Sequence, residues 1–89
     1  MSVKRFDGIT GTVTTVATAI AIAGSGGSSD TGLVVQNIDS SINLNVYGDN
    51  AVLAAVLVPW QAISLPWRPS ISLAAASGTI SYAIANTHD

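Results

Sequence analysis

The sequence predicts one small all-β domain, an antiparallel β-sandwich or barrel of about seven to eight strands in a jelly-roll-like arrangement. Several short segments alternate between apolar and polar residues, which is the periodicity of strands. Turn-forming residues interrupt these segments at intervals of roughly 8 to 12 residues, as they do in sandwiches and barrels. A chain of 89 residues is long enough for one domain. We expect an N-terminal arm at 1–8, the sandwich at 9–85 and a C-terminal tail at 86–89.

The clearest strand signal lies in segments 33–37 and 42–47, which are joined by the polar turn Asp39-Ser40-Ser41. Short polar side chains favour such turns because they hydrogen-bond the nearby backbone. Alternate residues of a strand point to the same face of a sheet. We therefore expect a β-hairpin at the centre of the sandwich, with Ile42, Leu44 and Val46 in the core and Asn43, Asn45 and Tyr47 outside it.

Further strands are expected on both sides of this hairpin. Residues 9–23 are rich in Thr, Val and Ile, and β-branched residues at every second position favour a strand over the helix that alanine propensity would allow. The alanines of this segment share one face, which a neighbour could approach closely: Ala17, Ala19, Ala21 and Ala23. The apolar run 51–58 is expected to be a strand buried on both faces. Segments 61–67, 70–75 and 79–85 complete the set, and because of Pro66 the first of them is expected to lie at a sheet edge or to end there.

Two classes of partner are excluded by composition. Only three basic residues are present and the net charge is −2, so the chain lacks the clustered cations that nucleic acid binding requires. The uncharged segment 8–29 is too rich in Thr and Gly to span a membrane, and the greasier segment 51–60 is too short. No secretory leader is expected, because Phe6-Asp7-Gly8 follows the two basic residues where an apolar core would be needed. We therefore expect neither a nucleic acid nor a membrane partner.

The sequence offers no constellation for catalysis. Its one histidine, His88, lies next to the C-terminal residue, which is a poor platform for a catalytic imidazole. Metal sites need convergent His, Cys or carboxylate ligands, and the chain has no Cys and five Asp dispersed over separate turns. The Gly-rich stretch 24–32 lacks the Lys-Ser/Thr of a phosphate-binding loop and is interpreted as a connector. We expect no enzyme activity, no cofactor and no metal.

Trp60, Trp67 and Arg68 are the remaining conspicuous side chains. The tryptophans are seven residues apart, an odd separation that places them on opposite faces of a strand, so core or interface packing is favoured over a shared sugar-stacking platform. Arg68 has two interpretations of equal weight, an intersubunit pair with an aspartate or a solvated corner residue.

The low charge content points to a protein that works in an assembly. Charged residues make up 9% of the chain, against about 25% in typical soluble domains. A freely diffusing monomer normally carries a mixed, charged surface. Much of the surface here must be uncharged, which suggests a chain packed against copies of itself or a larger partner. The alternative is a monomer with an uncharged polar surface.

Three segments together resemble a known class of proteins: Leu33-Val34-Val35-Gln36-Asn37, Asn45-Val46-Tyr47-Gly48 and Ser72-Leu73-Ala74-Ala75-Ala76-Ser77-Gly78-Thr79. A hydrophobic strand that ends in Gln-Asn, a strand that ends in Val-Tyr-Gly and a late Ala-Ser-Gly turn occur in this order. The chain resembles the small β-sandwich decoration or cement proteins of tailed-bacteriophage capsids over roughly residues 9–85. Where many of those proteins carry a basic residue before the hydrophobic strand, Gly32 stands here. The resemblance implies a homotrimer that clamps neighbouring major capsid proteins and has no active site.

We therefore expect a structural protein on the exterior of a virion capsid, made in the host cytoplasm. The residues expected to contact partners are Lys4, Arg5, Phe6, Asn43, Asn45, Tyr47, Trp60, Trp67 and Arg68. The alternatives are another virion component, such as a tail, fibre or head-completion protein, and a small carbohydrate-binding module that uses Trp60 or Trp67.

Overall fold

A computed structural model describes residues 5–22 and 32–88. This part of the chain forms eight strands and no helix. The strands are β1 (Arg5–Val13), β2 (Thr18–Ala21), β3 (Gly32–Asn37), β4 (Leu44–Tyr47), β5 (Leu53–Leu57), β6 (Ala62–Leu65), β7 (Ser70–Ala75) and β8 (Ile80–His88). The described residues accordingly contain no helical segment that could cross a bilayer.

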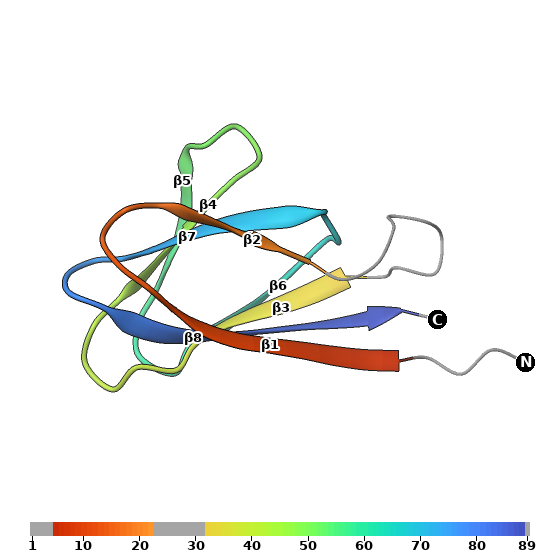
Figure 1. Cartoon of the computed structure of the whole chain (residues 1–89), viewed down its shortest axis with the longest axis horizontal. Coiled ribbons are helices and arrows are strands. Elements are labelled where there is room, and N and C mark those ends of the chain that lie inside the picture. The colour runs from red at the N-terminus through yellow and green to blue at the C-terminus, as the bar shows by residue number, and fades with distance from the viewer. Residues whose placement is uncertain (1–4, 23–31, 89) are drawn as a thin grey trace, which may run out of the picture.

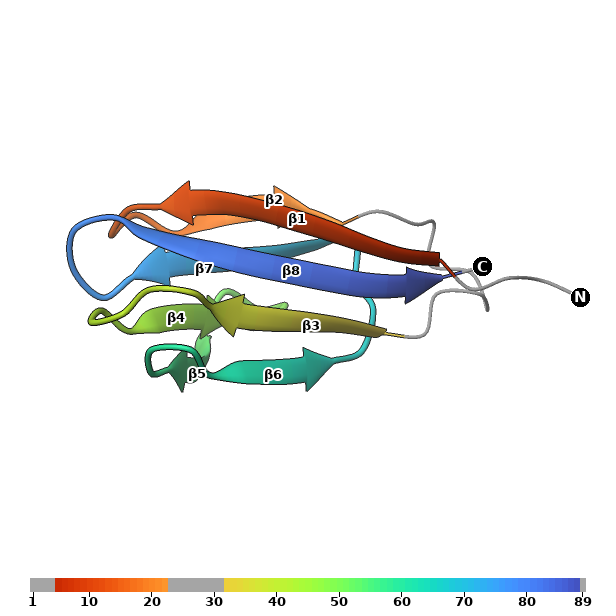
Figure 2. The ribbon, with the colours of Figure 1, turned by 90° about the horizontal axis from the view of Figure 1, so that it is seen from below.

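The strands form two four-stranded antiparallel sheets that pack face to face (Figures 1 and 2). One sheet has the order β1-β8-β3-β6 and is called sheet A; the other has the order β2-β7-β4-β5 and is called sheet B. Four pairings are nested in the sequence: β1 with β8, β2 with β7, β3 with β6 and β4 with β5. This is the pattern of one long hairpin rolled into two layers. The predicted all-β sandwich is confirmed, and its strand order is that of a jelly roll.

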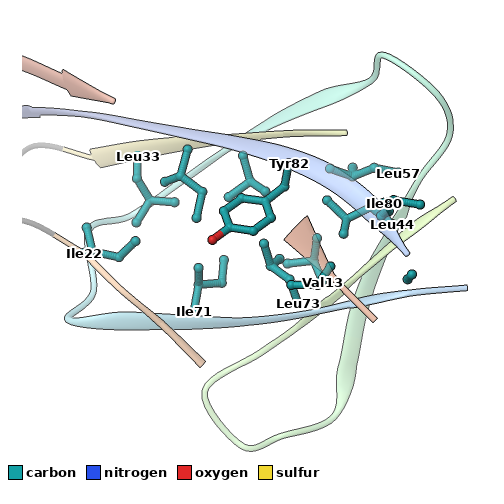
Figure 3. Packing of buried hydrophobic residues seen from close by; sticks show 13 residues of the cluster. Val13, Ile22, Leu33, Leu44, Leu57, Ile71, Leu73, Ile80 and Tyr82 are labelled. Carbon is teal, nitrogen blue, oxygen red and sulfur yellow. The ribbon is translucent and has the colours of Figure 1, made fainter. Parts of the chain in front are cut away.

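Alternation along the strands builds the core between the sheets. The inward residues of β4, Leu44 and Val46, are 0% and 2% exposed, and Ile42 packs against them from the preceding loop. Figure 3 shows the Tyr82 ring in the middle of this core, among aliphatic side chains from both sheets. Burial of each large aliphatic side chain contributes about 1.5–3 kcal/mol. The buried cluster comprises Val13, Ile22, Leu33, Val35, Leu44, Val46, Leu57, Ile71, Leu73, Ala75, Ile80, Tyr82 and Ile84.

The predicted hairpin of segments 33–37 and 42–47 is wrong. Both segments are strands, but β3 belongs to sheet A and β4 to sheet B, so the turn between them is an arch from one layer to the other. Asn37 at the end of β3 fixes this arch. The Asn37 side chain is fully buried, and its Nδ2 group donates to the backbone carbonyl oxygens of Ile42 at 2.8 Å and Leu57 at 3.0 Å. The side-chain oxygen Oδ1 of Asn37 accepts the Asp39 N–H at 2.9 Å. The β4–β5 pair, around the turn at residues 48–52, is the hairpin that sequence neighbours do form.

The apolar run 51–58 is a strand, but its predicted burial on both faces is also wrong. Strand β5 is the outer strand of sheet B, and only Leu57 is buried. Leu53 and Val56 are 48% and 45% exposed. An apolar run can belong to a central or to an edge strand, and long-range topology decides between them. The edge position expected for 61–67 is confirmed, because β6 is the outer strand of sheet A and ends at Leu65 before Pro66.

Strands β1 and β8 are longer than the sequence predicted. Their pairing runs from Arg5 opposite His88 to Val13 opposite Ile80. Residues 5–8 and 86–88 therefore extend sheet A, although they were expected to be parts of an arm and a tail. The connector predicted at 24–32 lies outside the described residues, apart from Gly32 at the start of β3.

Candidate interaction surfaces

The charged side chains described by the structure lie in loops. Asp39 is in the arch between β3 and β4, Asp49 is in the turn between β4 and β5, and Arg68 lies between β6 and β7. Over residues 8–22 and 32–86, no strand of either sheet contributes a charged side chain. Two uncharged sheet faces are therefore the main candidate sites.

The outer face of sheet A, which we call face A, is built from small and uncharged side chains. Its middle is a shallow depression of about 160 Å³ lined almost entirely by apolar surface. The depression forms where Gly8, Ala85 and Val34 lie side by side on β1, β8 and β3. Thr10, Ala83 and Gln36 make the next row. Val34 is 38% exposed, although it lies on a strand between two others.

The outer face of sheet B, which we call face B, carries the residues predicted to face outward from 42–47. Asn45 pairs with Ala74 and Val56, and Tyr47 pairs with Ser72, while their strand neighbours enter the core. Asn45 and Tyr47 are half-buried, as is Asn43 just before β4. The prediction that these three residues lie outside the core is confirmed. Their role as contact residues stays a prediction.

Of the alanines predicted to share one face at 17–23, Ala19 and Ala21 belong to face B, whereas Ala17 lies before β2 begins. Ala19 and Ala21 pair with Ser72 and Ser70 of β7 and are exposed, whereas Ile20 lies on the core side. In the single chain nothing among the described residues covers these alanines. Ala23 lies outside the described residues.

A strip of exposed apolar residues follows the side of the sandwich where β5 and β6 are the outer strands (Figure 2). Among the residues whose burial the structure describes, five of the seven exposed large hydrophobic residues lie between positions 52 and 60: Val52, Leu53, Val56, Val58 and Trp60. The sequence contains no charged residue from position 50 to position 67. We call these five side chains the β5 strip.

Trp60 is presented by a strained turn. Residues 58–61 form a tight turn in which Gln61 N donates to the Val58 carbonyl at 3.0 Å, with Pro59 and Trp60 at the two central positions. Trp60 has φ = 68°, a left-handed conformation that normally favours glycine or asparagine at this position. The Gln36 amide donates to the Trp60 carbonyl at 3.0 Å and supports the turn. Trp60 is 59% exposed. An exposed aromatic residue therefore occupies a position where its backbone conformation is costly.

The structure separates Trp67 and Arg68 from Trp60, since β6 lies between them. Trp67 is half-buried and packs against the core, which confirms core packing for this tryptophan and excludes a shared platform of the two rings. Arg68 Nη1 lies 2.9 Å from Asp49 Oδ1 of the same chain. The Arg68 side chain is 19% exposed and that of Asp49 is 77% exposed. Arg68 therefore pairs with an aspartate of its own chain. This solvent-exposed ion pair contributes about 0–1 kcal/mol to stability.

The remaining predicted contact residues belong to the N-terminal segment. Lys4 lies outside the described residues, while Arg5 and Phe6 begin β1 opposite His88 and Thr87. No group of three or more metal-ligating side chains occurs within the described residues.

The pKa of the Asp39 carboxylate is shifted by hydrogen bonds in the arch. The Asp39 carboxylate accepts the backbone N–H groups of Ser41 at 2.9 Å and Ile42 at 2.8 Å. These bonds favour the charged form and lower the pKa of Asp39 below its ordinary value. The carboxylate is engaged in shaping the arch, which gives it a structural role.

The sequence interpretation missed Val34, Val56 and Val58 as surface residues. They sit in apolar segments, and an apolar segment suggests burial. For Val56 and Val58, the signal that could have found them is the pair of prolines, Pro59 and Pro66, which flank β6 and place the neighbouring chain at the rim of the sandwich. Comparisons of the chain with protein-family models, with curated proteins and with solved structures find no match.

Proposed function

We propose that this chain is a non-enzymatic structural protein of a virion, a cement or decoration protein that binds an assembled phage capsid as a homotrimer and stabilises it. The observation that carries the proposal is the absence of charged side chains from the strands of both sheets over residues 8–22 and 32–86. Such faces meet little desolvation cost when they are covered by another protein. A protein that binds only the assembled shell stabilises that shell by mass action and needs no active site.

Face A is the surface we assign to the capsid. Its small side chains lose little conformational entropy on contact, and its depression can accept an apolar side chain of a major capsid protein. The jelly-roll order supports the proposal by analogy, since viral capsid domains commonly have it, although lectins and cupins have it too. The resemblance of the three quoted segments to phage decoration proteins adds to this support.

Co-sedimentation with capsids tests the proposal. The purified protein is mixed with capsids that lack it, and both binding and the resistance of the shell to heat are measured. We expect saturable binding with many copies per particle and a shell that withstands higher temperature. A monodisperse monomer that stays in the supernatant would contradict the proposal. Binding of only a few copies would instead indicate a tail, fibre or head-completion protein.

A carbohydrate-binding module is the second candidate, and the strained, exposed Trp60 favours it. Aromatic rings bind sugars through their faces, and an exposed ring on a supported turn is suited to this contact. A glycan array with wild-type protein and the Trp60→Ala variant separates the two functions. Binding that the substitution abolishes would favour the sugar module, and an array without signal would count against it.

A further inference from the structure

We propose that copies of this chain join head to tail by strand addition, with the β5 edge of one copy pairing antiparallel with the β2 edge of the next. The inference rests on the proposed function only in taking the chain to act as a homo-oligomer. It names the surface that makes the oligomer, which is distinct from face A. Sheet B would then continue from one copy into its neighbour.

The β5 edge carries neither of two features that commonly prevent edge pairing, a charge or a proline, although a bulge shifts its pairing with β4 between Val46 and Tyr47. Exposed edges are usually protected by charges, prolines or very short strands. The outer strand of sheet A on the same side, β6, has four residues and is followed directly by Pro66. Strand β5 has neither a charge nor a proline, and it carries Leu53 and Val56 in exposed positions. We expect an edge of this composition to pair with another strand.

The direction of the strands permits head-to-tail continuation. All pairs in sheet B are antiparallel, and the sheet has four strands, so β2 and β5 run in opposite directions at its two edges. A neighbouring copy in the same orientation therefore offers β2 antiparallel to β5. Antiparallel pairing is the arrangement that the rest of the sheet uses.

Backbone hydrogen bonds show which edge groups are open. Ala76 N donates to Asn43 O, so the odd-numbered residues of β4 bond to β7 and the even-numbered ones bond to β5. Val46 and Leu44 face Ala55 and Leu57, which leaves the N–H and C=O of Val56 pointing away from the sheet.

The same reasoning applies to β2. Ile22 N donates to Pro69 O, so Ile20 and Thr18 bond to β7, and the backbone groups of Ala19 and Ala21 point away. The register that overlaps the two strands fully and matches their open groups places Val56 opposite Ala19 of the next copy. Their side chains then lie on face B, and Ala55 lies opposite Ile20 on the core side.

The two edges complement each other in size and charge. Each pair sets a large side chain against an alanine, Val56 against Ala19 and Ile20 against Ala55. No charged residue occurs at positions 8–29 or 50–67, so two copies with the same net charge of −2 approach without local repulsion. A two-fold contact of β5 with β5 would leave every β2 edge open. The head-to-tail contact satisfies both edges of sheet B at once, and such contacts close into rings when the rotation allows.

Thiol cross-linking tests the pairing, because the chain has no cysteine of its own. The variants Ala19→Cys and Val56→Cys are treated with a short bis-maleimide separately and as a mixture. We expect covalent dimers in the mixture and none from either variant alone. Cross-linking of Val56→Cys by itself would overturn the head-to-tail arrangement in favour of a two-fold contact, and absence of cross-links in the mixture would overturn edge pairing altogether.

A charge placed on the edge supplies a second test with a matched control. Val56 and Val34 have similar exposure, 45% and 38%. Light scattering should show loss of the oligomer for Val56→Lys and an unchanged oligomer for Val34→Lys, while both unfold at wild-type denaturant concentrations. A folded Val56→Lys variant that keeps its oligomeric mass would overturn the inference. Capsid binding tests the proposed function separately. A wild-type monomer that still binds capsids would overturn edge pairing and leave the cement role intact. An edge-paired oligomer that does not bind capsids would support edge pairing and contradict the cement role.

Discussion

Asn37 joins three segments of the chain through one buried amide. Its NH₂ group donates to carbonyl oxygens of Ile42 and Leu57, so both of its protons point at acceptors. In Asn37→Asp, a carboxylate of the same shape would face these two oxygens without a donor. We expect a loss of about 3–5 kcal/mol in the free energy of unfolding at neutral pH, the cost of an uncompensated buried charge. Urea unfolding measures it.

The pH dependence of this variant identifies the cause. Burial raises the pKa of an aspartate at this site, so the destabilisation is present above that pKa and declines as acid protonates the group. Asn45→Asp on face B is the matched control, because its side chain is half-exposed and a charge there stays hydrated. Equal losses for the two variants would contradict the role assigned to the Asn37 amide.

Asp39 makes the wild-type protein sensitive to acid. Its pKa is lower in the folded state than in the unfolded chain, so its contribution to stability is present above the unfolded pKa and is lost as pH falls through the folded one. We expect the free energy of unfolding to decrease below about pH 4, the region where aspartates titrate. Asp39→Asn should be less stable at neutral pH and should show a flatter decline in acid. Denaturant titrations from neutral pH into acid test this, and parallel curves for the two proteins would refute it.

At the scale of single elements, the ladder between β1 and β8 contains a close contact at a glycine. Gly11 lies opposite Tyr82, and a Cβ on Gly11 would lie 2.7 Å from the Tyr82 hydroxyl oxygen and 3.0 Å from the ring carbon that bears it. Tyr82 is 5% exposed and belongs to the core cluster, so its ring has little room to move. We expect Gly11→Ala to cost about 1–3 kcal/mol, the usual penalty of overpacking.

A double-mutant cycle checks this prediction. Tyr82→Phe removes the oxygen that makes the closest contact, so Gly11→Ala should cost less in the Tyr82→Phe background than in the wild type. Thermal unfolding of the four proteins gives the coupling. Additive losses would show that the penalty does not come from the Tyr82 hydroxyl oxygen.

The sequence was informative about elements and less so about their placement. Period-2 alternation assigned Leu44 and Val46 to the core and Asn45 and Tyr47 to the outer face correctly, because burial on one face leaves that pattern in any sheet. It could not tell that β3 and β4 lie in different sheets. Polar turn residues such as Asp39 suit a hairpin and an arch equally well. The arch is fixed by the hydrogen bond that the Asn37 side chain donates to Leu57, twenty residues away. The apolar run 51–58 was misplaced for the same reason: the exposure of Val56 depends on strand order, which is long-range information.

At the scale of the whole molecule, the strands carry no charged side chain over residues 8–22 and 32–86, so assembly through their faces should resist salt. Val34→Lys places a cation beside the depression of face A, and since Val34 is partly exposed we expect its free energy of unfolding to change by only about 0.5 kcal/mol. Capsid binding should be lost. Val16→Lys is the matched control, because Val16 is 70% exposed in the loop before β2 and lies away from face A.

Co-sedimentation at low and high salt completes this test. Salt screens contacts between exposed charges over about 10 Å at 0.1 M. Binding of the wild type should therefore change little between low and high ionic strength. Binding that disappears in salt, or a Val34→Lys variant that binds as well as Val16→Lys does, would contradict the assignment of face A.

The nested pairing of strands also sets the order in which the protein can fold. Strand β8 lies between β1 and β3 in sheet A, so β1, the earliest strand in the sequence, has no partner in its sheet until β8 arrives. The β4–β5 hairpin, by contrast, closes over a short loop and can form first. Contacts between positions so far apart slow folding, and sheet-rich domains of this kind typically take milliseconds to seconds. During that interval β1 is unpaired and β3 can pair only with β6, which leaves its other edge open. In a cell that makes many copies at once, this is the period in which chains can pair with the wrong neighbour.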